Sequence, residues 1–361
     1  MDHGFEHGVT PDMDLFLSRS VILYKRLRKH GKHVEQVRHA LTFDVGCRTA
    51  EKFRMRASVI LTEPYAGLQA QALGLAEAAG LEPELVSLMP RAPWKFVSAR
   101  MWPAPLQAVT LPVIRDAVVF SAGGTAAVVA AALRRPGRAL VQVQHPRIDP
   151  SRFDVIVVNR HDGLNGPNVI VTRTALHRAN SARLVQAREV WGPRLAHLPR
   201  PLVSVLVGGS NGRFRLDAAV SAALGAQLAQ MVRLDGVGIA LTPSRRTAPE
   251  AVLALRAALE PVGGWVWDRA GENPYFGLLA CADGIVVTED SVSMVSEACA
   301  TAAPVFLAAL PGHSRRIRQF SQYLIEDGRV RAYTGRFELW PVHPLDDTQA
   351  AADEMNARIA C

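Results

Sequence analysis

Short apolar runs alternate with amphipathic stretches along most of the chain. The apolar runs are nearly continuous, which is typical of strands buried on both faces of a parallel sheet. Between them, apolar residues recur at the three- and four-residue spacing of helices that cover such a sheet. The predicted strands are 57–63, 84–89, 117–122, 139–144, 153–158, 202–209, 237–243, 283–288 and 303–309. The predicted helices are 67–80, 125–135, 214–233, 249–262, 291–301, 314–328 and 346–359.

A proline-rich stretch divides this alternation into two series. Residues 192–201 read GPRLAHLPRP, and the strand–helix alternation restarts directly after them. We therefore predict an α/β protein with two Rossmann-like domains, at 57–197 and 198–345. A ligand cleft is expected between them, at the carboxyl ends of their strands. The last segment, 346–361, is predicted to be a helix that packs back toward the first domain.

Residues 1–56 differ in composition from the rest of the chain. They contain four of its five lysines, and their 11 basic and 7 acidic side chains give a net charge of +4. Two interpretations stay open for this N-terminal extension. It is either a basic amphipathic helix that lies on an anionic membrane surface, or a loosely ordered extension outside the core.

Composition excludes several classes of protein. The total formal charge is +8, so the 305 residues after 56 carry only a dispersed +4, which argues against nucleic acid as a partner. The four cysteines lack metal-ligand or disulfide spacing. We expect no secretion signal, because the first residues lack its charged, apolar and small-residue layout. The apolar run 117–133 is interrupted by Gly-Gly, so it predicts a strand, a turn and a helix rather than a membrane span. We expect a cytoplasmic protein, or one peripherally bound to the inner membrane, with no metal site.

The stretch 283–307, DGIVVTEDSVSMVSEACATAAPVFL, places polar side chains where a predicted strand meets a helix. With Asp290 or Ser291 as N-cap, helical spacing puts Asp290, Ser293, Met294 and Glu297 on one stripe, opposite the valines that pack on the sheet. A nucleotide fits this stripe, with its diphosphate at the helix start and its ribose on the carboxylate. The alternative is a capped surface helix with a solvated Glu297.

Three other turns of the second domain carry polar side chains at strand ends. Glycines allow close backbone approach to an anion, and arginines make bidentate contacts with phosphate. Because all these turns meet at one sheet edge, they predict a single nucleotide-sugar site, although each is also compatible with an ordinary turn. The predicted binding residues in these turns are Gly208, Gly209, Ser210, Asn211, Ser244, Arg245, Arg246, Asn273 and Tyr275.

Two of these segments resemble a known enzyme class. VLVGGSNG and SVSMVSEACATAAPVFL are similar to the donor-binding segments of the peptidoglycan GlcNAc-transferase, a GT-B glycosyltransferase. That resemblance implies a two-domain GT-B-like fold that binds a nucleotide-sugar in its C-terminal domain. It places Ser291–Ser293 at the diphosphate and Glu297 at the ribose.

A wider set of motifs resembles the mitochondrial-fission family, whose plant members are named for elongated mitochondria. The chain is similar to its bacterial members over most of 57–350. The motifs are LGLAEAAGL, QHPRIDPSRFDVIVVNRHDGLNGPNVIVT, LTPSRRT and GENPYFGLLACADGIVVTEDSVSMVSEA. In the mitochondrial-fission family the first turn usually reads like Gly-Asn-Glu before the helix, and in the glycosyltransferases it is Gly-rich with a His. Residues 63–71, EPYAGLQAQ, have neither pattern, which weakens the case for catalysis on the acceptor side.

Together these resemblances imply two alternative functions. The first is a glycosyltransferase-like protein that uses a nucleotide-sugar as donor substrate and transfers the sugar to a lipid-linked or polysaccharide acceptor, with no tightly bound cofactor. The second is a non-catalytic adaptor on the same scaffold, because the plant members act by recruiting fission machinery.

The first domain offers candidates for the acceptor side. The turn with Gly123, Gly124 and Thr125 leads into a helix, and Arg147 follows the next predicted strand. His161 and Asp162 could act as general base and orienting carboxylate. Each group has a plainer interpretation as an ordinary turn or polar strand end.

Overall fold

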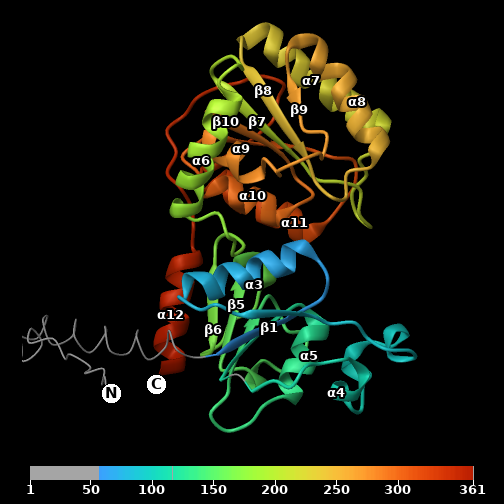
Figure 1. Cartoon of the computed structure of the whole chain (residues 1–361), viewed down its shortest axis with the longest axis vertical. Helices are drawn as coiled ribbons and strands as arrows, with labels where there is room; N and C mark the ends of the chain where they lie inside the picture. The colour runs from blue at the N-terminus through green and yellow to red at the C-terminus, as the bar shows by residue number, and fades with distance from the viewer. Residues whose placement is uncertain (1–56, 116, 361) are drawn as a thin grey trace, which may run out of the picture. The chain divides into compact units, whose positions relative to one another are not determined.

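The computed structural model describes residues 57–115 and 117–360, which form two parallel sheets with helices on their faces (Figure 1). The N-terminal extension lies outside these residues, so its two interpretations stay predictions. Every strand pairing in the two sheets is parallel. The predicted α/β class with two Rossmann-like domains in a GT-B-like arrangement is therefore confirmed.

The first sheet has the strand order β2-β1-β3-β4-β5-β6. Its apolar residues fill a core with α4 (Pro105–Ala108) and α5 (Gly124–Ala132), and α3 (Ala66–Ala78) packs on β1 and β3. Because the chain runs from β1 to β2 on one side and from β3 to β4 on the other, the direction of strand order reverses between β1 and β3. Its strands are β1 (Ser58–Thr62), β2 (Glu84–Ser87), β3 (Val118–Ala122), β4 (Ala139–Val143), β5 (Val155–Asn159) and β6 (Val169–Thr172).

The second sheet has the order β12-β11-β10-β7-β8-β9, and its strand order reverses between β7 and β10. Its strands are β7 (Leu202–Val207), β8 (Gly238–Pro243), β9 (Trp265–Val266), β10 (Gly284–Thr288), β11 (Val305–Ala308) and β12 (Val330–Ala332). Its helices are α7 (Ala218–Asp235), α8 (Pro249–Leu259), α9 (Tyr275–Cys281), α10 (Val292–Cys299) and α11 (Arg315–Glu326). In open parallel sheets, ligands bind outside the carboxyl ends of strands at such reversals.

The chain crosses between the sheets earlier than the proline-rich stretch predicted. Residues Ser181–Leu195 form α6, which packs on α9 of the second half. Trp191 and Leu195 belong to the core of the second sheet, and a β-carbon on Gly277 would lie 2.2 Å from Trp191 Cγ. The boundary at 197 is therefore corrected: the crossover precedes α6, because Trp191 and Leu195 of that helix are buried against the second half.

The last helix, α12 (Thr348–Ala360), lies beside the first sheet (Figure 1). Gln349 donates a hydrogen bond to the carbonyl of Ala78 at 3.1 Å, and Arg358 donates one to the carbonyl of Pro167 at 3.0 Å. These contacts return the chain from the second half to α3 and β6 of the first.

Candidate functional site

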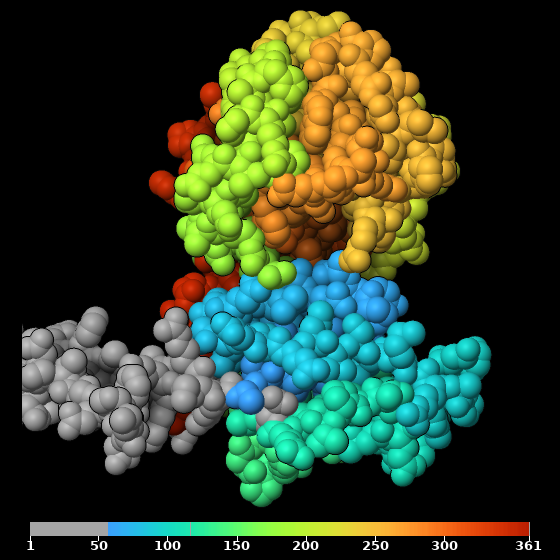
Figure 2. Space-filling model, viewed as in Figure 1, coloured from blue at the N-terminus to red at the C-terminus, as the bar shows by residue number. Residues whose placement is uncertain are grey.

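A cleft of about 790 Å³ lies at the carboxyl ends of β8 and β10 and against the start of α3. In Figure 2 the hollow opens between the blue segment that carries α3 and the orange segments of the second half. Nine of the fourteen predicted nucleotide-sugar residues line it: Ser244, Arg245, Arg246, Asn273, Tyr275, Ser291, Ser293, Met294 and Glu297. The structure therefore brings together side chains from three separate strand-end turns.

Arginines dominate the charge of the cleft. Arg245 and Arg246 follow β8, and Arg269 follows β9. Arg269 has a φ of 70°, and its guanidinium donates hydrogen bonds to the carbonyls of Ser244 and Thr247. These bonds hold the turn that carries the other two arginines. Arg245 makes no hydrogen bond or ion pair with any residue that the structure describes, so its guanidinium is available to an anion.

Glu297 is the carboxylate of the cleft, and it is 7% exposed rather than solvated. Tyr275 Oη donates a hydrogen bond to Glu297 Oε2. Burial raises the pKa of Glu297 to about 7, against the opposing effect of this hydrogen bond. Burial and the nearby carboxylate raise the pKa of Tyr275 well above its usual value. The pair places a titratable acid deep in the cleft, which rules out the solvated-surface interpretation of Glu297.

The two predicted serines at the start of α10, Ser291 and Ser293, make different contacts. Ser291 is the N-cap, and its side chain accepts a hydrogen bond from Met294 N. Ser293 Oγ accepts a hydrogen bond from Gln71 Nε2 of α3 at 3.3 Å. A β-carbon on Gly67 would lie 3.1 Å from the same oxygen. Ser293 therefore joins the two halves at the edge of the cleft.

Asp290 does not share the stripe that the sequence predicted. It precedes the N-cap, and its side chain is fully buried. Its carboxylate accepts hydrogen bonds from Thr288 Oγ1 at 2.7 Å, Gly209 N at 3.2 Å and Arg246 Nη2 at 2.8 Å. The prediction that Asp290 faces the ligand is wrong, because the carboxylate turns inward to the reversal point between β7 and β10.

The glycine turn after β7 also lies outside the cleft lining. Gly208 N donates to Thr288 Oγ1 at 2.8 Å, and a β-carbon on Gly208 would lie 2.2 Å from Asp290 Oδ1. The predicted role of Gly208 and Gly209 in binding an anion is corrected, because their N–H groups already bind side chains of this chain. The side chains of the next two residues, Ser210 and Asn211, accept hydrogen bonds from backbone N–H groups of the same loop.

The His161–Asp162 pair is also outside the cleft. β5 ends at Asn159, and a 3-10 turn (Arg160–Asp162) directs both side chains toward α11. Asp162 pairs with Arg316, and the His161 ring packs edge-on against Phe320 at 5.3 Å. Burial and the charge of Arg316 lower the pKa of His161 to about 4. The general-base prediction is therefore corrected, because the pair packs at the junction of the two halves.

The acceptor-side candidates divide between two places. Gly124, Thr125 and Arg147 line a second cavity of about 310 Å³ in the first half. Gly123 lies behind them, in a left-handed conformation with a φ of 93°. This second cavity lies over the carboxyl ends of β1, β3 and β4.

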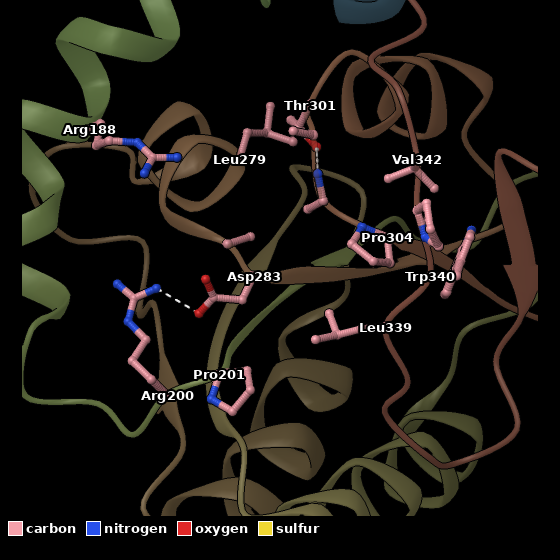
Figure 3. A pocket seen from close by; sticks show the side chains of 14 residues that line it. Arg188, Arg200, Pro201, Leu279, Asp283, Thr301, Pro304, Leu339, Trp340 and Val342 are labelled. Carbon is pink, nitrogen blue, oxygen red and sulfur yellow. Dashed lines mark hydrogen bonds and ion pairs between the residues drawn. The ribbon is translucent and has the colours of Figure 1, made fainter.

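A third cavity, of about 770 Å³, opens at the opposite edge of the second sheet, where β7, β10 and β11 begin (Figure 3). Arg200 pairs with Asp283 there at 2.9 Å, and Leu339 and Trp340 come from the segment that follows β12. Ligands of parallel sheets bind at the carboxyl edge. We therefore place the candidate site in the 790 Å³ cleft.

Several cleft residues escaped the sequence analysis. Trp267 and Arg269 follow β9, a strand of two residues that is too short to leave a periodic signal. The wall from the first half consists of Pro64, Tyr65, Ala66, Gly67 and Ala70. The sequence did give one signal for this wall, because the turn at 63–71 departs from the family pattern.

No group of three or more His, Cys, Asp or Glu residues in 57–115 or 117–360 is arranged to hold a metal ion. Within the same two ranges, no helix is both long and apolar enough to cross a bilayer. Cys281 and Cys299 are buried and free.

Comparison with known sequences gives a family match. The family described as Mitochondrial fission ELM1 matches residues 66–359. The Mitochondrial fission protein ELM1 of Arabidopsis thaliana is 30% identical over 276 residues, which cover 67% of this chain. The match spans 64% of the plant protein's own length.

Solved structures align with most of this chain at low sequence identity. The UDP-GlcNAc 2-epimerase of Methanocaldococcus jannaschii aligns with a TM-score of 0.50 and 11% identity, over 84% of this chain and 99% of its own. The MurG protein of Acinetobacter baumannii aligns with a TM-score of 0.45 and 14% identity, over 84% and 94%. The epimerase alignment supports the fold.

Proposed function

The chain belongs to the mitochondrial fission ELM1 family, and we propose that it binds a nucleotide-sugar in the 790 Å³ cleft, as the donor for a transfer reaction. The observation that supports this most is the polar lining of the cleft, in which Arg245, Arg246 and Arg269 gather beside a single carboxylate, Glu297. Arginines suit a diphosphate, and a buried carboxylate suits the hydroxyls of a ribose.

Within this proposal the three arginines are not equivalent. Arg246 is engaged by Asp290, and Arg269 by backbone carbonyls, so both are held in place at the edge of the cleft. Arg245 is exposed and unpaired among the described residues, so it is the arginine whose charge a phosphate would neutralise. Trp267 adds an aromatic ring to the lining, and a nucleotide base could stack on it.

The direct test is nucleotide binding by the unmodified protein. Calorimetry with UDP-GlcNAc, UDP-glucose, UDP and the corresponding guanine and adenine nucleotides should find a ligand. At a hundred times its Kd, the bound ligand should stabilise the fold by about 2.7 kcal/mol. If none of these compounds binds or raises the melting temperature, the cleft is not a nucleotide site.

Arg245→Ala is expected to weaken binding of the nucleotide found in that screen by about tenfold. A charge-assisted hydrogen bond contributes about 1.5–3 kcal/mol, and exposure of Arg245 favours the lower end of that range. The melting temperature without ligand should not move, since the side chain has no partner to lose. The matched control is Arg233→Ala, an exposed arginine on α7 that lies outside the cleft lining. Equal affinity in both variants would contradict a phosphate role for Arg245.

Glu297→Gln tests the ribose contact in the same cleft. At pH 8 the carboxylate is mostly ionised, because its pKa is about 7, and it can accept hydrogen bonds from a diol. The variant should bind the nucleotide about tenfold more weakly, while the 2′,3′-dideoxy nucleotide should bind both proteins equally. An equal loss for the dideoxy compound would show that Glu297 acts on the shape of the cleft and not on the ribose.

Transfer also needs a base for the acceptor hydroxyl. His161 and Asp162 lie elsewhere, and the cleft lining holds no carboxylate other than Glu297. The lining of the cleft therefore supports only the proposal that it binds the donor. The reaction that we propose for the bound donor is transfer of its sugar to a lipid-linked or polysaccharide acceptor. Release of UDP from the bound nucleotide-sugar, with and without membrane lipid extracts, measures this reaction.

A further inference from the structure

The second cavity lies where open parallel sheets bind ligands. Its wall includes Glu63, which follows β1, Gly124 and Thr125, which begin α5 after β3, and Arg147, which follows β4. The strand order of the first sheet reverses between β1 and β3, so the cavity covers the reversal point. In the second sheet the equivalent reversal point is filled by the buried carboxylate of Asp290.

The cavity concentrates positive charge. Lys95 and Arg100 come from the segment after β2, and Arg147 comes from the turn after β4. None of the three has an ion-pair partner among the described residues, although Lys95 Nζ lies 4.8 Å from the centre of the Phe96 ring. Partial burial, and then the charges of Arg147, Arg316 and Arg100, lower the pKa of the nearby His145. This effect shows that these charges act on one small region.

The start of α5 adds to this charge and faces the same wall. Its N-cap is Gly123, which offers no side-chain acceptor, and its first turn contains no acid. A β-carbon on Gly124 would lie 3.6 Å from Arg147 Cγ, so the stem of Arg147 packs over the first residue of the helix. Arg147 adopts a left-handed backbone with a φ of 63°, a conformation that costs free energy for a non-glycine residue.

Glu63 is the single acid among the residues that line the cavity. A β-carbon on Gly123 would lie 2.6 Å from its Oε2, so the carboxylate rests against the turn before α5. The next residues in sequence, 64–67, line the 790 Å³ cleft of the proposed nucleotide-sugar site, called the donor cleft below. Glu63 therefore stands at the boundary of the two hollows.

We propose that the second cavity binds the phosphate group of a phosphorylated molecule, held by Lys95, Arg100, Arg147 and the start of α5, with a neighbouring hydroxyl of that molecule donating to Glu63. A phosphate monoester carries about −1.5 to −2 charges. It therefore matches the three unpaired cations better than a ligand with a single carboxylate group would. If the donor cleft holds a nucleotide-sugar, this molecule is the acceptor, a role that rests on the proposed function. Phosphate binding itself does not.

The phosphate could come from a soluble ester or from a lipid headgroup. Phe96 is 80% exposed and Met101 is 73% exposed, and both lie beside the cationic residues of the cavity rim. Two probes distinguish the sources: glycerol 3-phosphate in solution, and phosphatidylcholine vesicles with or without phosphatidylglycerol. Both are measured without nucleotide.

The test compares the unmodified protein with Arg147→Asn and with the double change Lys95→Gln, Arg100→Gln. Asparagine tolerates the left-handed backbone, so Arg147→Asn removes charge without added strain. We expect each variant to bind glycerol 3-phosphate at least about tenfold more weakly, with an unchanged melting temperature. Arg152→Gln, an exposed arginine of the same half outside the cavity, is the matched control and should bind normally.

The outcomes separate this site from the donor cleft. Arg245→Ala should leave glycerol 3-phosphate binding unchanged, and UDP should not compete with it. A phosphate site that survives while all nucleotide binding is absent supports the second cavity and contradicts the donor proposal. Binding to anionic vesicles alone, lost in Arg147→Asn, identifies the lipid headgroup as the source. If neither probe binds, if UDP displaces glycerol 3-phosphate, or if all variants bind alike, the proposal is overturned.

Discussion

Glu297→Gln is expected to unfold at pH 8 with a free energy about 3 kcal/mol larger than that of the unmodified protein. Burial raises the pKa of Glu297 from 4.5 to about 7. Each unit of pKa shift corresponds to 1.36 kcal/mol, and the side chain is too buried for solvent to screen the effect. Above pH 7 the folded protein must hold a buried carboxylate, a penalty that a neutral glutamine lacks.

The sign of this effect follows from proton binding. Between about pH 4.5 and pH 7 the folded state holds the Glu297 proton and the unfolded state releases it, so this group's contribution to stability is lost as the pH rises. His161, with its pKa lowered to about 4, acts in the opposite direction, because its contribution is lost as the pH falls from 6.5 toward 4. Because His161 is present in both proteins, its contribution cancels when the unfolding free energies of the variant and the unmodified protein are subtracted at the same pH.

Urea unfolding of both proteins at pH 5 and pH 8 measures this difference. The gap should shrink to below about 1 kcal/mol at pH 5, where most folded molecules are protonated at Glu297. Tyr275 can still donate to the glutamine carbonyl, so the hydrogen bond survives the change. Parallel stability curves for the two proteins would show that the pKa of Glu297 is the same in the folded and unfolded states, contrary to this account.

Asp290→Ala is expected to lose about 2–4 kcal/mol of unfolding free energy. The change removes the shared acceptor of Gly209 N, Thr288 Oγ1 and Arg246 Nη2. An unsatisfied buried donor costs about 1–3 kcal/mol. The Arg246 side chain is 42% exposed and can hydrogen-bond to water instead, so the loss of its ion pair with Asp290 adds little to the effect. Chemical denaturation at pH 7 measures the effect.

Glu82→Ala is the matched control for Asp290→Ala. Glu82 is exposed and makes no hydrogen bond or ion pair with a described residue, so its loss should change stability by no more than about 0.5 kcal/mol. If Asp290→Ala matches this control, the glycine turn does not depend on the buried carboxylate. The turn would then be free to bind an anion, as the sequence first suggested.

The elements of the fold were largely predictable because most of them are long and periodic. β1, β3, β7 and β10 are fully buried five- or six-residue strands, and each leaves a mostly apolar run in the sequence. β6, β9 and β12 were missed, because strands of two to four residues carry little periodicity. α6 was missed because its proline and arginines suggest a linker, and only the packing of Trp191 on α9 shows where it belongs.

The site was predictable in its location but not in its detailed contacts. The sequence placed Ser244, Arg245, Asn273, Ser293 and Glu297 at strand ends of one sheet, and the structure gathers them around one cleft. The sequence could not show that Glu297 is buried against Tyr275, because these residues are 22 positions apart and meet only when α9 packs beside α10.

The sequence by itself determined most of this protein's strands and helices, and at which edge of each sheet its polar turns lie. Hydrophobic periodicity and glycine or proline turns are local properties, so they can be read along the chain. Only the tertiary structure decided which polar groups face the cleft and which bind one another. Asp290 and Arg246 are 44 residues apart, yet their pairing occupies two groups that the sequence had assigned to a ligand. A polar side chain bonds to whatever partner the packing of distant segments brings within reach, and no local pattern encodes that partner.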